Sequence, residues 1–299
     1  MRWKMKNITS IKTIIIIFAI SISLWNCTER IDLELDSTFT RLVVEGFVTN
    51  DTTAHWVRLS ETSDYFHNKT APAVTGAEVV LDDGVSVHVL TESDTLPGWY
   101  HTIPDYHGIP GRTYTLIIGN VDINKDGEPE DYSAASMMNP VNPLDSIKIE
   151  WFDTFFSGYQ VRVWAWDSPD PDWYAFKVWK NGVLVTDTLY ELIVQSDEFF
   201  NGNYTHGIPS QFLSTDKPDE IVEVGDTITF EINGITEEYY NYVIEAQSQV
   251  FPQTPLFSGP PANIRTNFNN GAIGFFEAYS VSYSSTIATA DIVNGGKPD

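Results

Sequence analysis

The sequence is poor in cysteine and in positively charged residues. It contains one cysteine, Cys27, in 299 residues, and 17 Lys and Arg against 41 Asp and Glu. A single thiol excludes an internal disulfide, so stability must come from buried apolar surface. The formal net charge of −24 excludes nucleic acid as a partner and disfavours lying flat on anionic lipid, because both need a basic surface. The 42% of hydrophobic residues suffices for one or two cores.

Established catalytic and zinc-binding motifs are also absent from the sequence. There is no HExxH pair, no paired-cysteine spacing and no nucleophile elbow. A catalytic triad built from distant residues would leave no local pattern, and nothing in the sequence selects one. We therefore expect a protein that is not an enzyme and that requires no cofactor.

The N-terminus has the layout of a secretory signal peptide. Four basic residues precede an apolar run at 13–25, which is too short to cross about 30 Å of hydrocarbon. The run closes in Leu24-Trp25-Asn26-Cys27 and resembles a bacterial lipobox, with Asn26 in place of the usual small residue. We expect a signal peptide at 1–26 and lipidation of Cys27; a plain signal peptide and an uncleaved anchor are the alternatives.

The segment after the cysteine is acidic and is expected to act as a tether. It covers residues 27–36, including Cys27. Removing residues 1–26 removes four basic residues and no acidic one, so the formal net charge changes from −24 to −28. The mature protein would then attach to a membrane through lipid, with its body held away from anionic headgroups.

The rest of the sequence is typical of an all-β protein. Short apolar–polar alternations recur at a spacing of about 8–12 residues with Gly, Pro and Asp turns between them, which indicates antiparallel sandwiches. Asp82-Asp83-Gly84 favours a tight hairpin between 77–81 and 85–90. We expect two immunoglobulin-like or transthyretin-like β-sandwich domains at 37–138 and 144–290. The proline-containing stretch at 139–143 would link them, and 291–299 would be a frayed tail.

One short helix is expected in the second domain, at residues 236–249. Thr236 can cap its N-terminus, and Glu237 and Glu238 complement the dipole of the first turn. Tyr239, Tyr242, Val243 and Ala246 would share one face.

Two stretches carry a family resemblance. They are Leu42-Val-Val-Glu45-Gly46 and the Gly-rich, aromatic segment at 259–264 and 270–280, and they resemble the bacterial envelope lipoproteins of domain-of-unknown-function family 4249. The resemblance extends from about residue 27 to 288. It implies an outer-membrane location, on either membrane face, and encoding beside TonB-dependent receptors, without established catalytic residues. Within the first domain, 74–79, 98–100 and 111–116 resemble carboxypeptidase regulatory-like and transthyretin-like sandwiches, which concerns fold only.

The sharpest local motif is an acidic loop that begins at Asp122. Oxygen ligands at alternate positions around a glycine are how a loop wraps a hard cation such as Ca²⁺. The twelfth position of an EF-hand, normally Glu, is Ser133 here. The loop is therefore either a calcium site or a solvated hairpin tip. The candidate ligands are Asp122, Asn124, Asp126, Glu128 and Glu130.

A second acidic loop holds Asp167, Asp170 and Asp172. Pro169 and Pro171 lie between these acids and explain the loop as a rigid turn. A metal is the weaker interpretation of this loop.

Four tryptophans flank that loop and form a candidate docking surface. In 159–166, the side chains of Tyr159, Val161 and Val163 point to one face of the expected strand. Trp164 and Trp166 point to the opposite face. If 159–166 pairs with 173–179, the four indoles share one face. The alternative is a buried layer covered by the helix or the C-terminal tail. The four are Trp164, Trp166, Trp173 and Trp179.

Together with the resemblance, these patterns predict a lipid-anchored, non-enzymatic accessory or ligand-binding partner of a TonB-dependent receptor. The tryptophan face or the segment at 259–279 would make the contact. One alternative is a structural or adhesin-like surface module stabilised by calcium. Another is a hydrolase of an extracellular polymer, which clustered acids beside the aromatic face would favour.

Overall fold

Strands form where the sequence alternates apolar and polar side chains. A computed structural model of the chain describes residues 40–63, 70–154, 157–250 and 264–295, all within the unit Thr40–Asp299. These residues are mostly β-sheet with two short helices, so the expected all-β class is confirmed at that level. The count of two sandwich domains stays a prediction.

The largest sheet contains nine strands. Its order is β12-β11-β15-β16-β1-β2-β6-β5, and β13 pairs with β11 from outside this path. Its strands are β1 (Leu42–Thr49), β2 (Trp56–Glu61), β5 (Thr91–Glu92), β6 (Trp99–His101), β11 (Trp173–Lys180), β12 (Val183–Leu184), β13 (Ile193–Ser196), β15 (Thr227–Ile235) and β16 (Ile273–Ile287).

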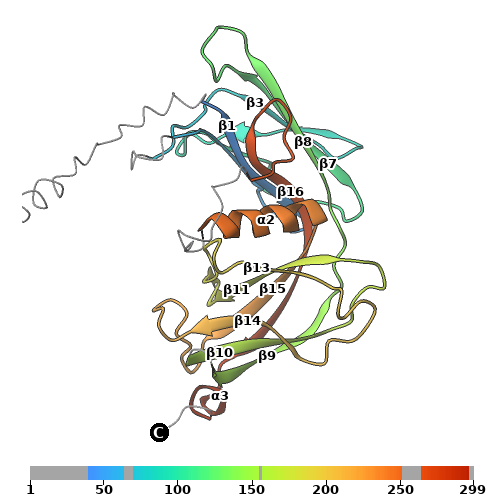
Figure 1. The fold of residues 1–299 in the computed structure, drawn as a ribbon, viewed down its shortest axis with the longest axis vertical. Helices are drawn as coiled ribbons and strands as arrows, with labels where there is room; N and C mark the ends of the chain where they lie inside the picture. Colours follow the sequence, from blue (N-terminus) through green and yellow to red (C-terminus); the bar gives the residue numbers. More distant parts are fainter. Residues whose placement is uncertain (1–39, 64–69, 155–156, 251–263, 296–299) are drawn as a thin grey trace, which may run out of the picture. The chain divides into compact units, whose positions relative to one another are not determined.

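Strand β16 joins the two halves of this sheet (Figure 1). Its first half pairs in parallel with β1, from Val43 opposite Ile273 to Thr49 opposite Tyr279. Its second half pairs antiparallel with β15, beginning where Ser280 lies opposite Gly234. One sheet therefore contains strands from both sides of the expected linker at 139–143, and the end of the chain completes the sheet that β1 and β2 begin.

A four-stranded sheet covers the β1–β2 end of the large sheet. Its order is β4-β3-β7-β8, and a hydrophobic core that includes Leu59, Tyr100, Leu116 and Phe276 lies between the two layers. Gly84, with φ of 81°, follows β3 as the Asp-Gly pattern predicted. The four strands are β3 (Glu78–Asp82), β4 (Val87–Val89), β7 (Thr113–Val121) and β8 (Glu130–Met137).

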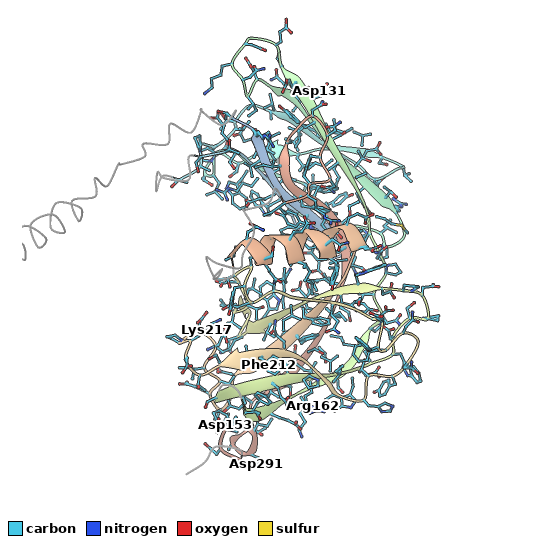
Figure 2. The ribbon with its side chains drawn as sticks, viewed as in Figure 1. Asp131, Asp153, Arg162, Phe212, Lys217 and Asp291 are labelled. Carbon is cyan, nitrogen blue, oxygen red and sulfur yellow. The ribbon has the colours of Figure 1, made fainter. Side chains whose placement is uncertain are left out.

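A three-stranded sheet covers the β11–β15 end. Its order is β14-β10-β9, namely β14 (Ile208–Ser214), β10 (Ser157–Ala165) and β9 (Leu144–Asp153). Tyr159, Val161 and Val163 are buried in a second core with Val178 and Phe230, so the alternation predicted for 159–166 is confirmed. Arg162 and Phe212, labelled in Figure 2, lie on β10 and β14.

Helix α2 (Glu237–Val250) confirms the helix expected at 236–249. Its backbone N–H at Tyr239 donates to Thr236 Oγ1 at 3.2 Å, the expected cap. The helix packs on β11, β13 and β16. Tyr239 and Tyr242 contact Phe275 of β16, so both faces of β16 are covered there.

Glu277 of β16 is a carboxyl group that is only 2% exposed. It accepts hydrogen bonds from the Thr236 N–H (2.7 Å), from Thr236 Oγ1 (2.9 Å) and from Ser136 Oγ (3.0 Å). Burial raises its pKa to about 8, against the lowering effect of these donors.

Residues 291–295 differ from the frayed tail expected at 291–299, of which 296–299 lie outside the described residues. Residues Ala290–Asn294 form helix α3. Ile292 and Val293 pack on the second core, and Tyr159 Oη donates to the Val293 carbonyl at 3.1 Å. Among the described residues, neither helix has the length and apolar character needed to cross a membrane.

Candidate functional site

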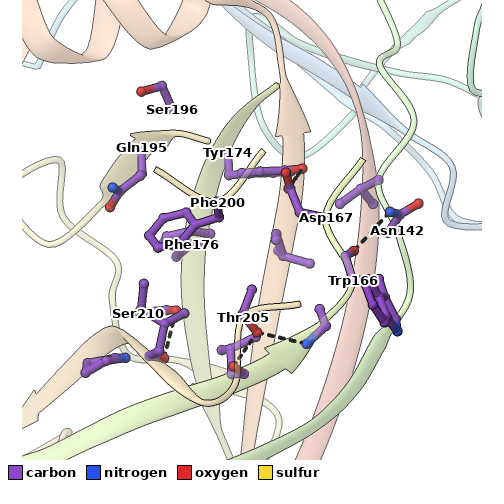
Figure 3. A pocket seen from close by; sticks show the side chains of 16 residues that line it. Asn142, Trp166, Asp167, Tyr174, Phe176, Gln195, Ser196, Phe200, Thr205 and Ser210 are labelled. Atoms are coloured by element: carbon purple, nitrogen blue, oxygen red, sulfur yellow. Dashed lines mark hydrogen bonds between the residues drawn. The ribbon is translucent and has the colours of Figure 1, made fainter. Parts of the chain in front are cut away.

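An apolar cavity of about 60 Å³ reaches the surface beside β10 and β11. Its walls include Val163, Tyr174 and Phe176, which belong to the second core, and the half-buried Ile208. Trp166 also lines the cavity and is 61% exposed, so the cavity opens at that residue (Figure 3). The volume suits a few waters or one small apolar group.

Three aspartates converge next to this cavity, and we call them the aspartate cluster: Asp167, Asp172 and Asp197. One carboxylate oxygen from each lies within 4.8 Å of the others. Asp167 follows β10, and Asp172 directly precedes β11. Because β13 pairs antiparallel with β11, with Ser196 opposite Trp173, the residue after β13 arrives beside the residue before β11. The Asp197 N–H then donates to the Asp172 carbonyl at 3.1 Å.

Tyr174 is the main hydrogen-bond donor to this cluster. Its Oη lies 2.7 Å from Asp167 Oδ1 and 3.3 Å from Asp172 Oδ2, and Figure 3 shows Tyr174 and Asp167 pointing toward one another. One hydroxyl proton cannot fully serve two acceptors. The Gly202 N–H donates to Asp167 Oδ2 at 3.1 Å, which ties the turn after β13 to the loop after β10.

Asp197 is the least satisfied member of the cluster. It is 3% exposed, and within the described ranges its Oδ2 has no hydrogen-bond partner. None of the ion pairs formed by the described residues includes Asp167, Asp172 or Asp197. Burial raises the pKa of Asp172 and of Asp197, and the charge of Asp167 raises both further. The cluster therefore concentrates negative charge without a countercharge from the described part of the chain.

Strand pairing does not bring together the four tryptophans of the predicted docking surface. Strands β10 and β11 lie in different sheets, where β10 pairs with β9 and β14. Trp166 alone among the four is exposed, and the other three are half-buried. A Cβ added at Gly207 would clash with the Trp164 ring, so Trp164 lies directly against the backbone there.

Trp179 has a structural contact of its own. Its Nε1 donates to Glu231 Oε2 at 2.6 Å, and Lys177 Nζ lies 3.1 Å from Glu231 Oε1. Lys177 also reaches Tyr279 Oη at 3.2 Å. Trp179 therefore helps satisfy a buried carboxylate between β11 and β15. The docking role predicted for the four tryptophans stays a prediction, and its most accessible member is Trp166.

Comparison with known proteins identifies the family. Residues 28–285 match the family described as "Domain of unknown function (DUF4249)". The chain belongs to this family. No curated protein matches the chain. Among solved structures, chicken CNTN1 FN1–FN3 domains are similar at 13% identity and a TM-score of 0.25, over 64% of this chain and 59% of that chain. The chain thus spans less than two thirds of that structure.

The DUF4249 description assigns no activity, so the expected calcium loop must be judged on its own contacts. Residues 122–129 connect β7 and β8, close to Asp131 in Figure 2. Asp122 accepts the N–H groups of Asp126 (3.1 Å) and Gly127 (2.9 Å). Asp126 accepts the N–H of Glu128 at 2.8 Å. Asp122 is half-buried and Asp126 is exposed, and backbone N–H groups satisfy both carboxylates. Calcium at Asp122, Asn124, Asp126, Glu128 and Glu130 stays a prediction.

Cys27, the tether at 27–36 and the signal peptide at 1–26 lie outside the described residues. Part of the second predicted contact segment, 259–263, also lies outside them. From residue 264 onward that segment is tied to the first core. Asn267 Nδ2 donates to the Phe276 carbonyl at 2.7 Å, and Phe276 N–H donates back to Asn267 Oδ1 at 3.1 Å.

The sequence indicated two members of the aspartate cluster and missed Asp197. Asp167 and Asp172 were assigned to a rigid turn because Pro169 and Pro171 separate them. Asp197 joins them only through the pairing of β13 with β11, and a four-residue strand such as β13 gives no clear alternation. No local pattern singles out Tyr174, whose hydroxyl donates to two members of the cluster.

Proposed function

We propose that this DUF4249 protein is a lipid-anchored envelope protein that binds a partner without catalysing a reaction, and that the partner is a TonB-dependent outer-membrane receptor. Cys27 is the proposed lipid attachment site, and the family match begins at the next residue. The acidic composition favours a protein partner over nucleic acid.

The observation that carries this proposal is the exposed aromatic surface at Trp166. Its ring lies 5.2 Å from that of Tyr204, which in turn lies 4.9 Å from that of His206. Exposed aromatic residues beside a pocket are typical of energetic centres in protein interfaces. The matching partner segment carries one small apolar side chain for the cavity and basic residues that complement the charge of −24.

The aspartate cluster gives the hydrolase alternative a specific observation, because clustered acids do lie near Trp166. Two facts favour binding over hydrolysis. Glycosidase carboxylates flank the scissile bond at about 5–9.5 Å, whereas the cluster oxygens lie within 4.8 Å. The adjoining cavity of about 60 Å³ is also too small for a sugar ring. A panel of extracellular polysaccharides incubated with the purified chain would reveal any cleavage.

The test is affinity purification of the full-length lipoprotein from native membranes, followed by identification of what co-purifies. The wild type should recover a TonB-dependent receptor. Trp166→Ala should lower that recovery about 30-fold, the effect of losing a central interface tryptophan worth about 2 kcal/mol. Phe47→Ala is the matched control, since Phe47 is also an exposed aromatic but lies on β1.

Cys27→Ser completes the same experiment. This variant should leave the membrane fraction and lose lipid labelling, because the acyl chains supply the membrane affinity. Recovery of no receptor by the wild type would overturn the proposed partner, and membrane retention of Cys27→Ser would overturn the anchor.

A further inference from the structure

We propose that the aspartate cluster binds one Ca²⁺ ion, held by the carboxylates of Asp167, Asp172 and Asp197. This inference does not depend on the proposed receptor. It concerns a site distinct from the loop at 122–130.

The first argument is geometric. Calcium binds oxygen ligands at about 2.3–2.6 Å, so ligands on opposite sides of one ion lie up to about 5 Å apart. One oxygen from each of the three carboxylates lies within 4.8 Å of the others. All three therefore fit around a single ion, with waters completing the six to eight ligands that calcium takes.

The second argument is the state of Asp197. Its side chain is 3% exposed, and its Oδ2 lacks a hydrogen-bond partner within the described residues. A buried, unpaired carboxylate oxygen is costly unless something compensates it. Its carboxylate converges on those of Asp167 and Asp172, so an ion bound where the three meet would compensate it.

The third argument concerns charge. No described lysine or arginine pairs with the cluster, and most of them form ion pairs elsewhere, as Lys177 does with Glu231. Tyr174 offers one proton to two of the three carboxylates. A hydroxyl hydrogen bond does not neutralise charge, whereas a divalent cation neutralises most of it. Carboxylate-only donor sets select hard cations of the calcium type over the softer zinc or copper.

Binding would fasten three separate segments together. Asp167 lies just after β10, Asp172 lies just before β11, and Asp197 lies just after β13. The turn after β13 is held by the Gly202 N–H, which donates to the Ser168 carbonyl at 2.8 Å. Phe200 in the turn and Trp166 in the first segment both line the cavity, so calcium would fix the shape of its opening.

The test is calcium titration of the full chain after removal of metal with EDTA, read by thermal unfolding and by calorimetric stoichiometry. We expect one ion per chain. The unfolding temperature should rise by about 5–10 °C at a calcium concentration 100 times the Kd. Magnesium at the same concentration should produce a smaller rise, because it dehydrates reluctantly and demands octahedral geometry.

Asp197→Asn should change the unfolding temperature in opposite directions without and with calcium, which a purely structural role of Asp197 would not do. Without calcium, the variant should unfold at a higher temperature than the wild type, because one buried charge is gone. It should also lose the calcium-dependent rise. Asp170→Asn changes an acid in the same loop outside the cluster and should keep the rise, and so should Asp126→Asn in the β7–β8 loop.

Three outcomes would overturn the proposal. They are no calcium-dependent change in the wild type, a calcium response that survives in Asp197→Asn, and a response lost in Asp126→Asn alone. If Asp197→Asn fails to fold, Asp172→Asn provides the same comparison.

Discussion

The two acidic regions of this molecule differ in how their carboxylates are satisfied. In the β7–β8 loop the acids are close in sequence and none is buried, and Asp122 and Asp126 accept backbone N–H groups of their own loop. In the aspartate cluster the acids come from three separate segments, and one of them, Asp197, is buried with no partner for Oδ2 in the part of the chain that the structure describes. The loop matched a calcium motif by spacing, whereas the cluster did not.

The difference teaches that spacing and convergence are separate kinds of evidence for a site. A hairpin tip uses Asp and Asn because their side chains hydrogen-bond backbone groups a few residues on, which imitates a ligand pattern. A site for a charged ligand needs charge that the protein leaves uncompensated. Burial is therefore the variable that the next three predictions test.

The largest effect is expected at Glu277, a buried acid that lies outside both acidic regions. Its pKa is about 8 in the folded protein, raised mainly by burial, with Glu238 adding a smaller repulsion. In the unfolded chain the pKa is near 4.3. Between these values the folded state holds a proton that the unfolded state has lost, so the contribution of Glu277 is full below about pH 4 and is lost as pH rises through about 8.

Glu277→Gln should therefore gain stability relative to the wild type as pH rises from 5 to 8, by about 1.4 kcal/mol per pH unit. The gain is measured as the difference between the urea unfolding free energies of the two proteins at each pH, which cancels the titration of other groups. Parallel curves for the two proteins would show that burial does not govern this carboxyl group.

The next effect is expected at Tyr174, the donor shared by two cluster acids. Tyr174→Phe should lower the unfolding free energy by about 1–3 kcal/mol, because two half-buried acceptors, Asp167 and Asp172, lose a partner. Tyr283→Phe is the matched control: Tyr283 Oη donates to Asp51 at an exposed site, where water replaces the lost hydroxyl. Urea unfolding at neutral pH compares the two, and equal losses would contradict the contrast between buried and exposed carboxylates.

The smallest effect is expected in the loop itself. Asp122→Ala removes the acceptor of two backbone N–H groups, but both groups are exposed to water, so the loss should stay at about 0.5–1 kcal/mol. Glu128→Ala in the same loop should cost less, since only its backbone N–H forms a hydrogen bond among those described. Thermal unfolding of both variants checks this order, and a loss above that of Tyr174→Phe would reverse the comparison.

Local features of the fold were predictable because local chemistry decides them. The alternation of Tyr159, Val161 and Val163 predicted their burial, and the Asp-Gly pair predicted the positive φ at Gly84. Thr236 predicted its own role as a helix cap. Each of these signals lies within a few residues of the structure it predicts.

Features that depend on distant pairing were not predictable. A shared tryptophan face would have required β10 and β11, which are neighbours in sequence, to pair, yet β10 pairs with β9 and β14. Nothing near Asp197 indicates that β13 lies beside β11, and nothing near Leu42 indicates that β1 lies parallel to β16. The site therefore became visible only when three segments were placed together, although two of its acids had been noticed.

Strand β16 also sets the order in which this molecule can assemble. The strand beside β1 is supplied by residues 273–279, so the first half of the large sheet keeps an open edge until almost the entire chain has emerged. Contacts of such long sequence separation slow folding, because the loop-closure entropy is lost before the pairing is gained. A chain interrupted before residue 273 lacks β16, and therefore β1 and β15 would each keep an unpaired edge.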